Sequence, residues 1–216
     1  MSAKTLIAIV EGDGEVKAVP ILARRILEHL RRERRFAVDP DRIICTRNGD
    51  RITEPHDASR HLGIEFYVQR AAREKPAGIL VIVDAEERCR KREEARLTPL
   101  GPHLLARAAP IAGSIPLGVV VANRMFESWF LADFHSLRSR GHLPKEADFP
   151  EWETPEAVGG PKWWMKSLLG DSYSERTLQP KFAELISLPV RPAMQRRAPS
   201  FWKLFRELDK LSHQDL

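Results

Sequence analysis

The feature that most constrains the fold is an apolar run that ends abruptly in acids, Gly78-Ile79-Leu80-Val81-Ile82-Val83-Asp84-Ala85-Glu86-Glu87. The run is too short to cross a membrane, and its β-branched residues are typical of a strand buried on both faces of a parallel sheet. A second run, Leu6-Ile7-Ala8-Ile9-Val10, ends in Glu11-Gly12-Asp13-Gly14-Glu15. Ligands of open parallel sheets bind beyond the carboxyl ends of the strands. If the two strands are neighbours, we expect their acids to converge.

Strands and helices alternate along the first part of the chain. The sequence predicts strands near residues 5–10, 42–46, 78–83 and 117–122. It predicts helices near 15–34, 57–75 and 125–133, and a helical segment over 88–109 that Pro99 and Pro102 interrupt. This alternation predicts the α/β class, with a parallel sheet covered by helices. After about residue 136 prolines, glycines and tryptophans become frequent, and only helical patterns return, at 175–187 and 200–211. We therefore predict an α/β domain over residues 1–137 and a helical appendage over 138–216 that packs on it.

Basic residues gather close to the acidic strand end. The 216-residue chain has a formal net charge of +5 and a pI near 9.4. One basic cluster directly follows the acids and contains Arg88, Arg90, Lys91 and Arg92. Such clusters suit a polyanionic partner, because phosphate neutralisation supplies most non-specific affinity for nucleic acid, although a solvated arginine-rich surface is the alternative reading. We predict that these four residues contact nucleic acid.

Several function classes are disfavoured by the sequence. No apolar run approaches the length of a membrane helix, and the N-terminus leads directly into a strand without a signal-peptide pattern. Cys45 and Cys89 are the only cysteines and lie in no CxxC or Cys/His cluster. No Ser-His-Asp arrangement, P-loop motif or zinc spacing is present. We expect a cytoplasmic protein with no membrane partner.

Carboxylates are the candidate ligands of a divalent cation. Hard cations such as Mg²⁺ take oxygen ligands, usually carboxylates together with water and substrate phosphate. Glu11, Glu15, Asp84 and Glu86 lie at the two strand ends, and Glu127 follows the last predicted strand. Alone, each acid is more often a surface residue or a helix-start charge, and Glu15 and Glu127 could serve in that role. The pairing of two acidic strand ends favours a Mg²⁺ or Mn²⁺ site formed by these five residues.

Most tryptophans are expected in the core. Trp129 lies at helical spacing from Phe126 and Phe130, which predicts packing rather than base stacking. The pair Trp163-Trp164 lies in a segment flanked by glycine and proline and could form a contact surface, but core packing is the first expectation.

At its acidic strand ends the chain resembles the Toprim fold, the metal-dependent module of topoisomerases, primases and overcoming-lysogenization-defect nucleases. That family places a glutamate at the end of its first strand and an Asp-x-Asp pair at the end of its third. Glu11 matches the first position, and Asp84-Ala85-Glu86 occupies the second with a glutamate in place of the second aspartate. Glu15, four residues after Glu11, resembles the nuclease branch.

Other segments are similar to a stand-alone bacterial Toprim-like family, domain-of-unknown-function 4276. They are Phe126–Asp133, Gly160–Lys162, Pro180–Ala183 and Pro199–Phe201. Together with the acidic motifs they span nearly the whole chain. What the resemblance implies is a fold and a metal site.

The resemblance implies Mg²⁺- or Mn²⁺-dependent phosphodiester cleavage of nucleic acid, with DNA expected ahead of RNA. Glu11, Asp84 and Glu86 would be catalytic and hold the metal, Glu11 alternatively acting as general acid/base, and Glu15 would complete a second-ion site. Such nucleases often work with an ATPase, so a separate ATPase partner is expected. The alternative is a non-catalytic adaptor, or nucleic-acid-binding module, of an ATPase-containing complex. A haloacid-dehalogenase-type phosphatase ranks last, because Glu11-Gly12-Asp13 lacks the Asp-x-Asp nucleophile of that class.

Overall fold

A parallel β-sheet organises the protein. The computed structural model describes residues 3–144, 154–170 and 173–213, and within these the sheet has five strands in the order β2-β1-β4-β5, with β3 pairing the end of β1. All strand pairs are parallel. The strands are β1 (Lys4–Val10), β2 (Phe36–Val38), β3 (Ile44–Cys45), β4 (Gly78–Asp84) and β5 (Leu117–Ala122). The prediction of an α/β fold with a parallel sheet is confirmed.

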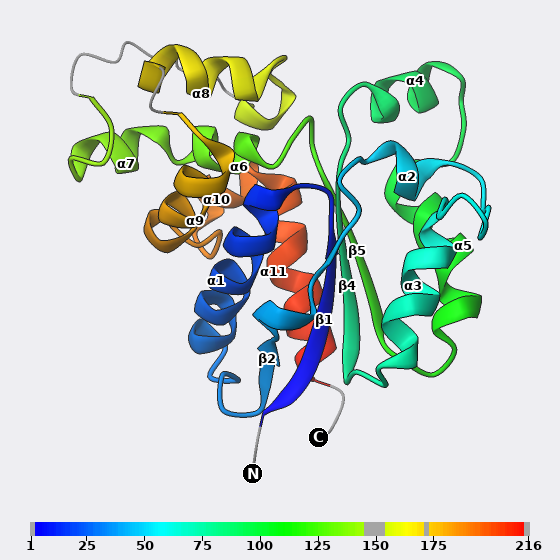
Figure 1. Cartoon of the computed structure of the whole chain (residues 1–216). Coiled ribbons are helices and arrows are strands. Elements are labelled where there is room, and N and C mark those ends of the chain that lie inside the picture. The colour runs from blue at the N-terminus through cyan, green and yellow to red at the C-terminus, as the bar shows by residue number, and fades with distance from the viewer. Residues whose placement is uncertain (1–2, 145–153, 171–172, 214–216) are drawn as a thin grey trace.

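Helices cover both faces of the sheet. On one face lie α1 (Asp13–His29), α9 (Glu175–Leu185) and α11 (Pro199–Ser212), and on the other lie α3 (Ile64–Arg73) and α5 (Leu100–Ala112) (Figure 1). The remaining elements are short: η1 (Pro40–Arg42), α2 (Asp50–Thr53), α4 (Arg88–Glu94), α6 (Glu127–Ala132), α7 (Phe134–Ser139), η2 (Pro155–Ala157), α8 (Pro161–Leu169) and α10 (Pro192–Arg197). The carboxyl ends of β1 and β4 point toward the end of the molecule that carries α8 and α4 (Figure 1).

Strand alternation builds two cores, one on each face. Leu6, Ala8 and Val10 of β1 pack with α1 and α11, whereas Ile7 and Ile9 pack with α3 and α5. Successive side chains of a strand point to opposite faces, so a strand that is covered on both sides needs apolar residues at every position. This requirement explains the continuous apolar runs in the sequence.

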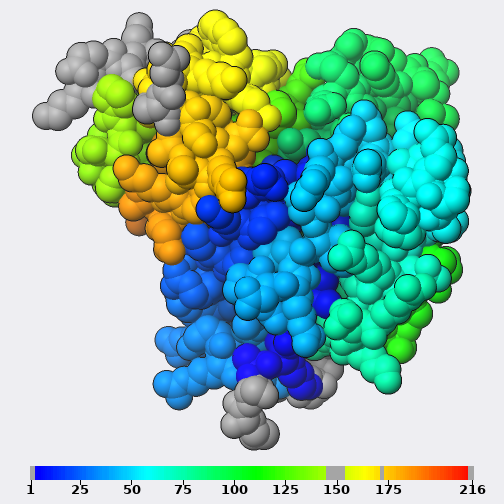
Figure 2. Space-filling view, viewed as in Figure 1, coloured from blue at the N-terminus to red at the C-terminus, as the bar shows by residue number. Residues whose placement is uncertain are grey.

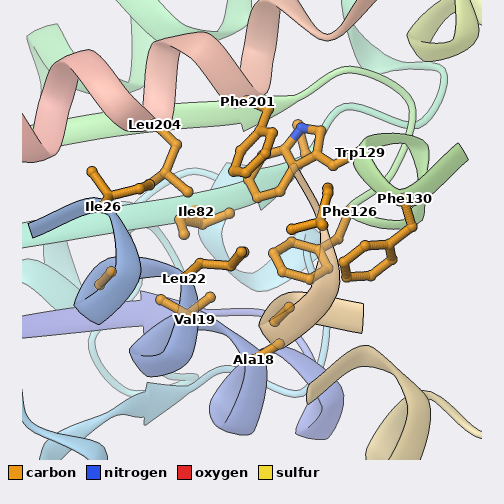
Figure 3. Close-up of a cluster of buried hydrophobic side chains, with 14 of the residues drawn as sticks. Ala18, Val19, Leu22, Ile26, Ile82, Phe126, Trp129, Phe130, Phe201 and Leu204 are labelled. Atoms are coloured by element: carbon orange, nitrogen blue, oxygen red, sulfur yellow. The ribbon is translucent and has the colours of Figure 1, made fainter. Parts of the chain in front are cut away.

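The C-terminal helices share the first of these cores with the sheet. Figure 3 shows Leu22 of α1, Ile82 of β4 and Leu204 of α11 side by side. Trp129 is fully buried, stacks on Phe201 with ring centroids 5.1 Å apart, and is therefore a core residue as predicted. The division at residue 137 stays a prediction, although α11 lies directly on the sheet.

Three local expectations differ from the structure. The strand β2 was not predicted, and the helix expected near 57–75 begins only at Ile64. Its first part is instead a turn, in which the Asp57 carboxylate accepts hydrogen bonds from the N–H groups of Ser59 and Arg60, because aspartate side chains compete with helical backbone bonding. Trp163 is 62% exposed, so the expectation of core packing is wrong for this residue. Part of the proline-rich stretch, residues 145–153, lies outside the described residues.

Among the described residues, none of the helices combines the length and the apolar character that a membrane span requires.

Candidate functional site

Glu11 and Asp84 meet because β1 and β4 are neighbouring parallel strands, with Ile9 beside Val81. Glu11 Oε1 accepts a hydrogen bond from the Asp84 backbone N–H at 2.8 Å, and Asp84 Oδ1 accepts one from the Phe126 N–H at 2.8 Å. The convergence of the two acidic strand ends is therefore confirmed. Each carboxylate is held through one of its oxygens.

Glu15 and Glu127 approach the same place from two helix starts. Glu15 is 7% exposed in the first turn of α1, and its carboxylate accepts a hydrogen bond from the Gly12 N–H. Glu127 is 1% exposed, and its Oε1 accepts hydrogen bonds from the Tyr173 hydroxyl at 2.9 Å and from Gln179 Nε2 at 3.1 Å. Both glutamates are thus helix-start charges that are also buried beside Asp84.

These four acids, which we call the carboxylate cluster, perturb one another's protonation. Burial, and then repulsion from Glu15, raises the pKa of Glu11 to about 8, against a hydrogen bond from Asp84 that lowers it. Burial, with repulsion from Glu127, raises the pKa of Glu15 to about 7. Burial and repulsion from Glu15, Glu11 and Glu127 raise the pKa of Asp84, and burial raises that of Glu127. The charged form of the cluster is therefore unfavourable without a cation.

Glu86 lies at the rim of the cluster. Its backbone is left-handed, with φ of 45°, and its N–H donates to the Arg124 carbonyl at 2.7 Å. The Glu86 side chain is 51% exposed and forms an ion pair with Arg88 at 3.4 Å. Its charge still raises the pKa of Glu11, but less than burial and Glu15 do. The structure therefore brings together Glu11, Glu15, Asp84 and Glu127, and leaves Glu86 at their edge.

The basic residues predicted to contact nucleic acid are largely engaged within the chain. Arg88 donates to the Asp84 carbonyl at 2.9 Å, and forms an ion pair with Asp50 at 2.6 Å. Arg90 lies between two glutamates of its own helix region, and Arg92 Nε donates to the Thr98 carbonyl at 2.6 Å. Lys91 is exposed. Exposed ion pairs such as those of Arg90 contribute little to stability.

Several residues around the cluster were not singled out from the sequence. A Cβ atom at Gly49 would overlap Glu11 Oε2, and one at Gly14 would overlap the side-chain oxygen of Gln179. Only glycine permits these close approaches. Lys162 of α8 forms an ion pair with Glu175 at 2.8 Å, and its charge lowers the pKa of Glu15 and of Glu127.

The positions of these residues could not be read from local patterns. Tyr173, Gln179 and Lys162 belong to the C-terminal segment and reach the cluster only through tertiary packing. The one sequence signal is the Gly160–Lys162 turn, which carries a family resemblance and no chemistry of its own.

The donor set suits a hard divalent cation, since carboxylate oxygens are the ligands that Mg²⁺ and Mn²⁺ prefer. The side-chain oxygen of Gln179, buried against Gly14, has no hydrogen-bond partner among the described residues. No group of three or more His, Cys, Asp or Glu in that part of the chain has the spacing of a ready-made metal site. Binding of a cation would therefore require side-chain rotation.

No curated protein matches the chain in sequence. Among solved structures, the C-terminal region of the OLD protein of Xanthomonas campestris pv. campestris is similar at a TM-score of 0.42 and 14% identity, over 97% of this chain and 94% of that chain. The model of a family described as a domain of unknown function, DUF4276, matches residues 10–209, and the chain belongs to that family.

Proposed function

We propose that the protein is a divalent-metal-dependent phosphodiesterase that cleaves nucleic acid at a Toprim-like site. The observation that carries this proposal is the carboxylate cluster at the carboxyl ends of β1 and β4. Burial raises the pKa of each of its four acids, Glu11, Glu15, Asp84 and Glu127. Perturbed acids gathered where parallel strands end are typical of functional sites. A bound Mg²⁺ or Mn²⁺ would offset the repulsion among these carboxylates.

Each residue of the cluster has a separate proposed task. Glu11, Asp84 and Glu127 each hold one oxygen in a hydrogen bond to the protein, and the other oxygen of each would bind the ion once the side chains have rotated. Glu15 would complete a second-ion site, and Glu86 would join after leaving Arg88. When bound, the metal supplies charge neutralisation at the phosphate and a more acidic water.

As the alternative to holding the ion, Glu11 transfers the proton. In that role its Oε1 accepts from the Asp84 N–H, so Oε2 is the oxygen that carries a proton below a pKa of about 8 in the metal-free protein. A pKa close to the working pH suits a group that both accepts and donates a proton. Lys162, whose charge already acts on Glu15 and Glu127, would hold the phosphate. Arg88 donates a hydrogen bond to the backbone carbonyl of Asp84 and so keeps Asp84 in place.

The test is a cleavage assay with the full chain. Plasmid, single-stranded DNA and RNA are incubated in EDTA, Mg²⁺ and Mn²⁺. Glu11→Gln and Asp84→Asn should abolish metal-dependent cleavage, while Glu93→Gln, an exposed acid of α4 outside the cluster, should retain it. Wild-type protein that cleaves none of the substrates with either metal, alone or with an added ATPase partner, would refute the proposal.

One observation favours the second candidate, a non-catalytic adaptor that binds nucleic acid within an ATPase-containing complex. Within the described ranges no three ligands are spaced for a metal in advance. An adaptor would bind nucleic acid equally well in EDTA and in Mn²⁺, and Glu11→Gln would leave that binding unchanged. The cleavage assay separates the two functions.

A further inference from the structure

An exposed tryptophan in α8 directly follows Lys162, whose charge acts on the carboxylate cluster. Trp163 of α8 is 62% exposed. Among the exposed large apolar residues in the described part of the chain, it has the highest exposure. Its neighbour Trp164 is half-buried against the core, and the two rings meet edge to face, with centroids 4.9 Å apart and planes at 81°. Trp164 therefore supports the indole of Trp163 while most of that indole remains open.

The backbone fixes this indole relative to the cluster. Gly160 is left-handed, with φ of 63°, and Pro161 occupies the first turn of α8, so the start of the helix is well defined. Lys162 acts electrostatically on Glu15, Glu127 and Asp84. Consecutive helical residues differ by about 100° around the helix axis. Trp163 therefore projects from α8 about 100° away from Lys162, the residue that acts on the cluster.

The surroundings of the indole suit a nucleic acid. Lys166, three residues after Trp163, lies on the same side of α8 and is exposed. An aromatic face next to a lysine is the arrangement that binds single strands, in which bases stack on the ring while the cation contacts the backbone. Figures 1 and 2 show α8 at the same end of the molecule as α4, which carries the basic residues Arg88 to Arg92.

We propose that Trp163 is a base-stacking platform that makes the site select nucleic acid with unpaired bases beside the bond to be cut. This inference rests on the proposed function and adds the form of its substrate. Bases within a duplex are stacked on one another and offer no free face to an indole on the protein surface. A single strand, a flap or a frayed end does offer one.

Binding in EDTA tests the platform without cleavage. The full chain is titrated onto fluorescein-labelled single-stranded DNA and onto a duplex of the same sequence, and anisotropy is recorded. Trp163→Ala should weaken single-strand binding by about 5- to 150-fold and change duplex binding by less than about twofold. Trp163→Phe should restore part of the single-strand affinity. Ile111→Ala, an exposed apolar residue of α5, should change neither.

The salt dependence of binding is a second measurement, and a purely structural role of these residues would not change it. Trp163→Ala should leave the slope of log affinity against log salt unchanged, whereas Lys166→Gln should reduce it by about 0.7, the value for one phosphate contact of a single strand. Equal weakening of both DNA forms, no weakening by Trp163→Ala, or no binding by the wild type would each overturn the inference. Retained single-strand preference in a protein that cleaves nothing would refute the proposed cleavage and leave the platform standing.

Discussion

Replacing Asp84 by asparagine should change stability in opposite directions with and without metal. Asp84 is buried, and its charge is opposed by Glu15, Glu11 and Glu127. Asparagine has nearly the same shape, and its side-chain oxygen can still accept the hydrogen bond from the Phe126 N–H. Asp84→Asn therefore removes a charge from the carboxylate cluster with little change in packing.

The size of the effect follows from the raised pKa values. The pKa of Glu11 rises from 4.5 to about 8 and that of Glu15 from 4.5 to about 7, with burial as the largest cause of each. Each pKa unit corresponds to ~1.4 kcal/mol, and only part of it reflects repulsion. We expect metal-free Asp84→Asn to be more stable by about 1–2 kcal/mol, or about 2–8 °C in Tm for a chain of this size.

A bound ion reverses the order of the two proteins. An ion that binds only the native state at a hundredfold excess over Kd stabilises it by about 2.7 kcal/mol, or about 5–11 °C in Tm. Wild type should show this shift, and Asp84→Asn should lose most of it. Thermal melts in EDTA and in millimolar Mn²⁺ at pH 8.5 measure both effects, with Glu93→Gln as a control that should follow wild type. Equal metal shifts in wild type and Asp84→Asn would exclude Asp84 from an ion site.

Two further predictions concern other parts of the structure. Gly49→Ala should displace the Glu11 carboxylate and reduce the Mn²⁺-induced Tm shift, whereas Gly101→Ala, whose Cβ would lie 3.5 Å from Val121 Cγ2, should leave that shift intact; melts of both variants test this. Burial raises the pKa of Glu156 to about 7 despite hydrogen bonds from Ser200, so its pKa in the folded protein exceeds its unfolded value. Ionisation of this carboxyl group should therefore lower the stability of the wild type by up to about 3 kcal/mol as the pH rises from 4.5 through 7. Denaturant unfolding across this range should show a smaller fall for Glu156→Gln, and identical pH profiles would contradict the assignment.

The sheet was predictable because its central strands are buried on both faces. The bounds predicted for β5 agree with the structure, and those for β4 differ by one residue. The strand β2 has only three residues, Phe36–Val38, which is too short for a periodic signal. It exists through its pairing with β1, so its formation depends on tertiary structure rather than on its own sequence.

The arrangement of the candidate site was predictable only where strand topology determines it. Glu11 and Asp84 could be paired because parallel neighbours end at the same edge of a sheet. The exposure of Trp163 could not be predicted, because tryptophan in a glycine- and proline-flanked segment fits both core and surface. Glu86 follows Asp84 closely in sequence, yet its left-handed backbone and its ion pair with Arg88 leave it at the rim of the cluster.

The C-terminal segment completes the carboxylate cluster as well as covering the sheet. Glu127 is held by Tyr173 and Gln179, and Gln179 in turn lies against Gly14 at the start of α1. The start of α1 also carries Glu15, whose carboxylate accepts the Gly12 N–H and is favoured there by the positive end of the helix dipole. Glu15 and Glu127 are therefore helix-start charges and, at the same time, members of the carboxylate cluster. The helix starts make burial of these acids tolerable, and Tyr173 and Gln179 of the C-terminal segment hold Glu127 in place.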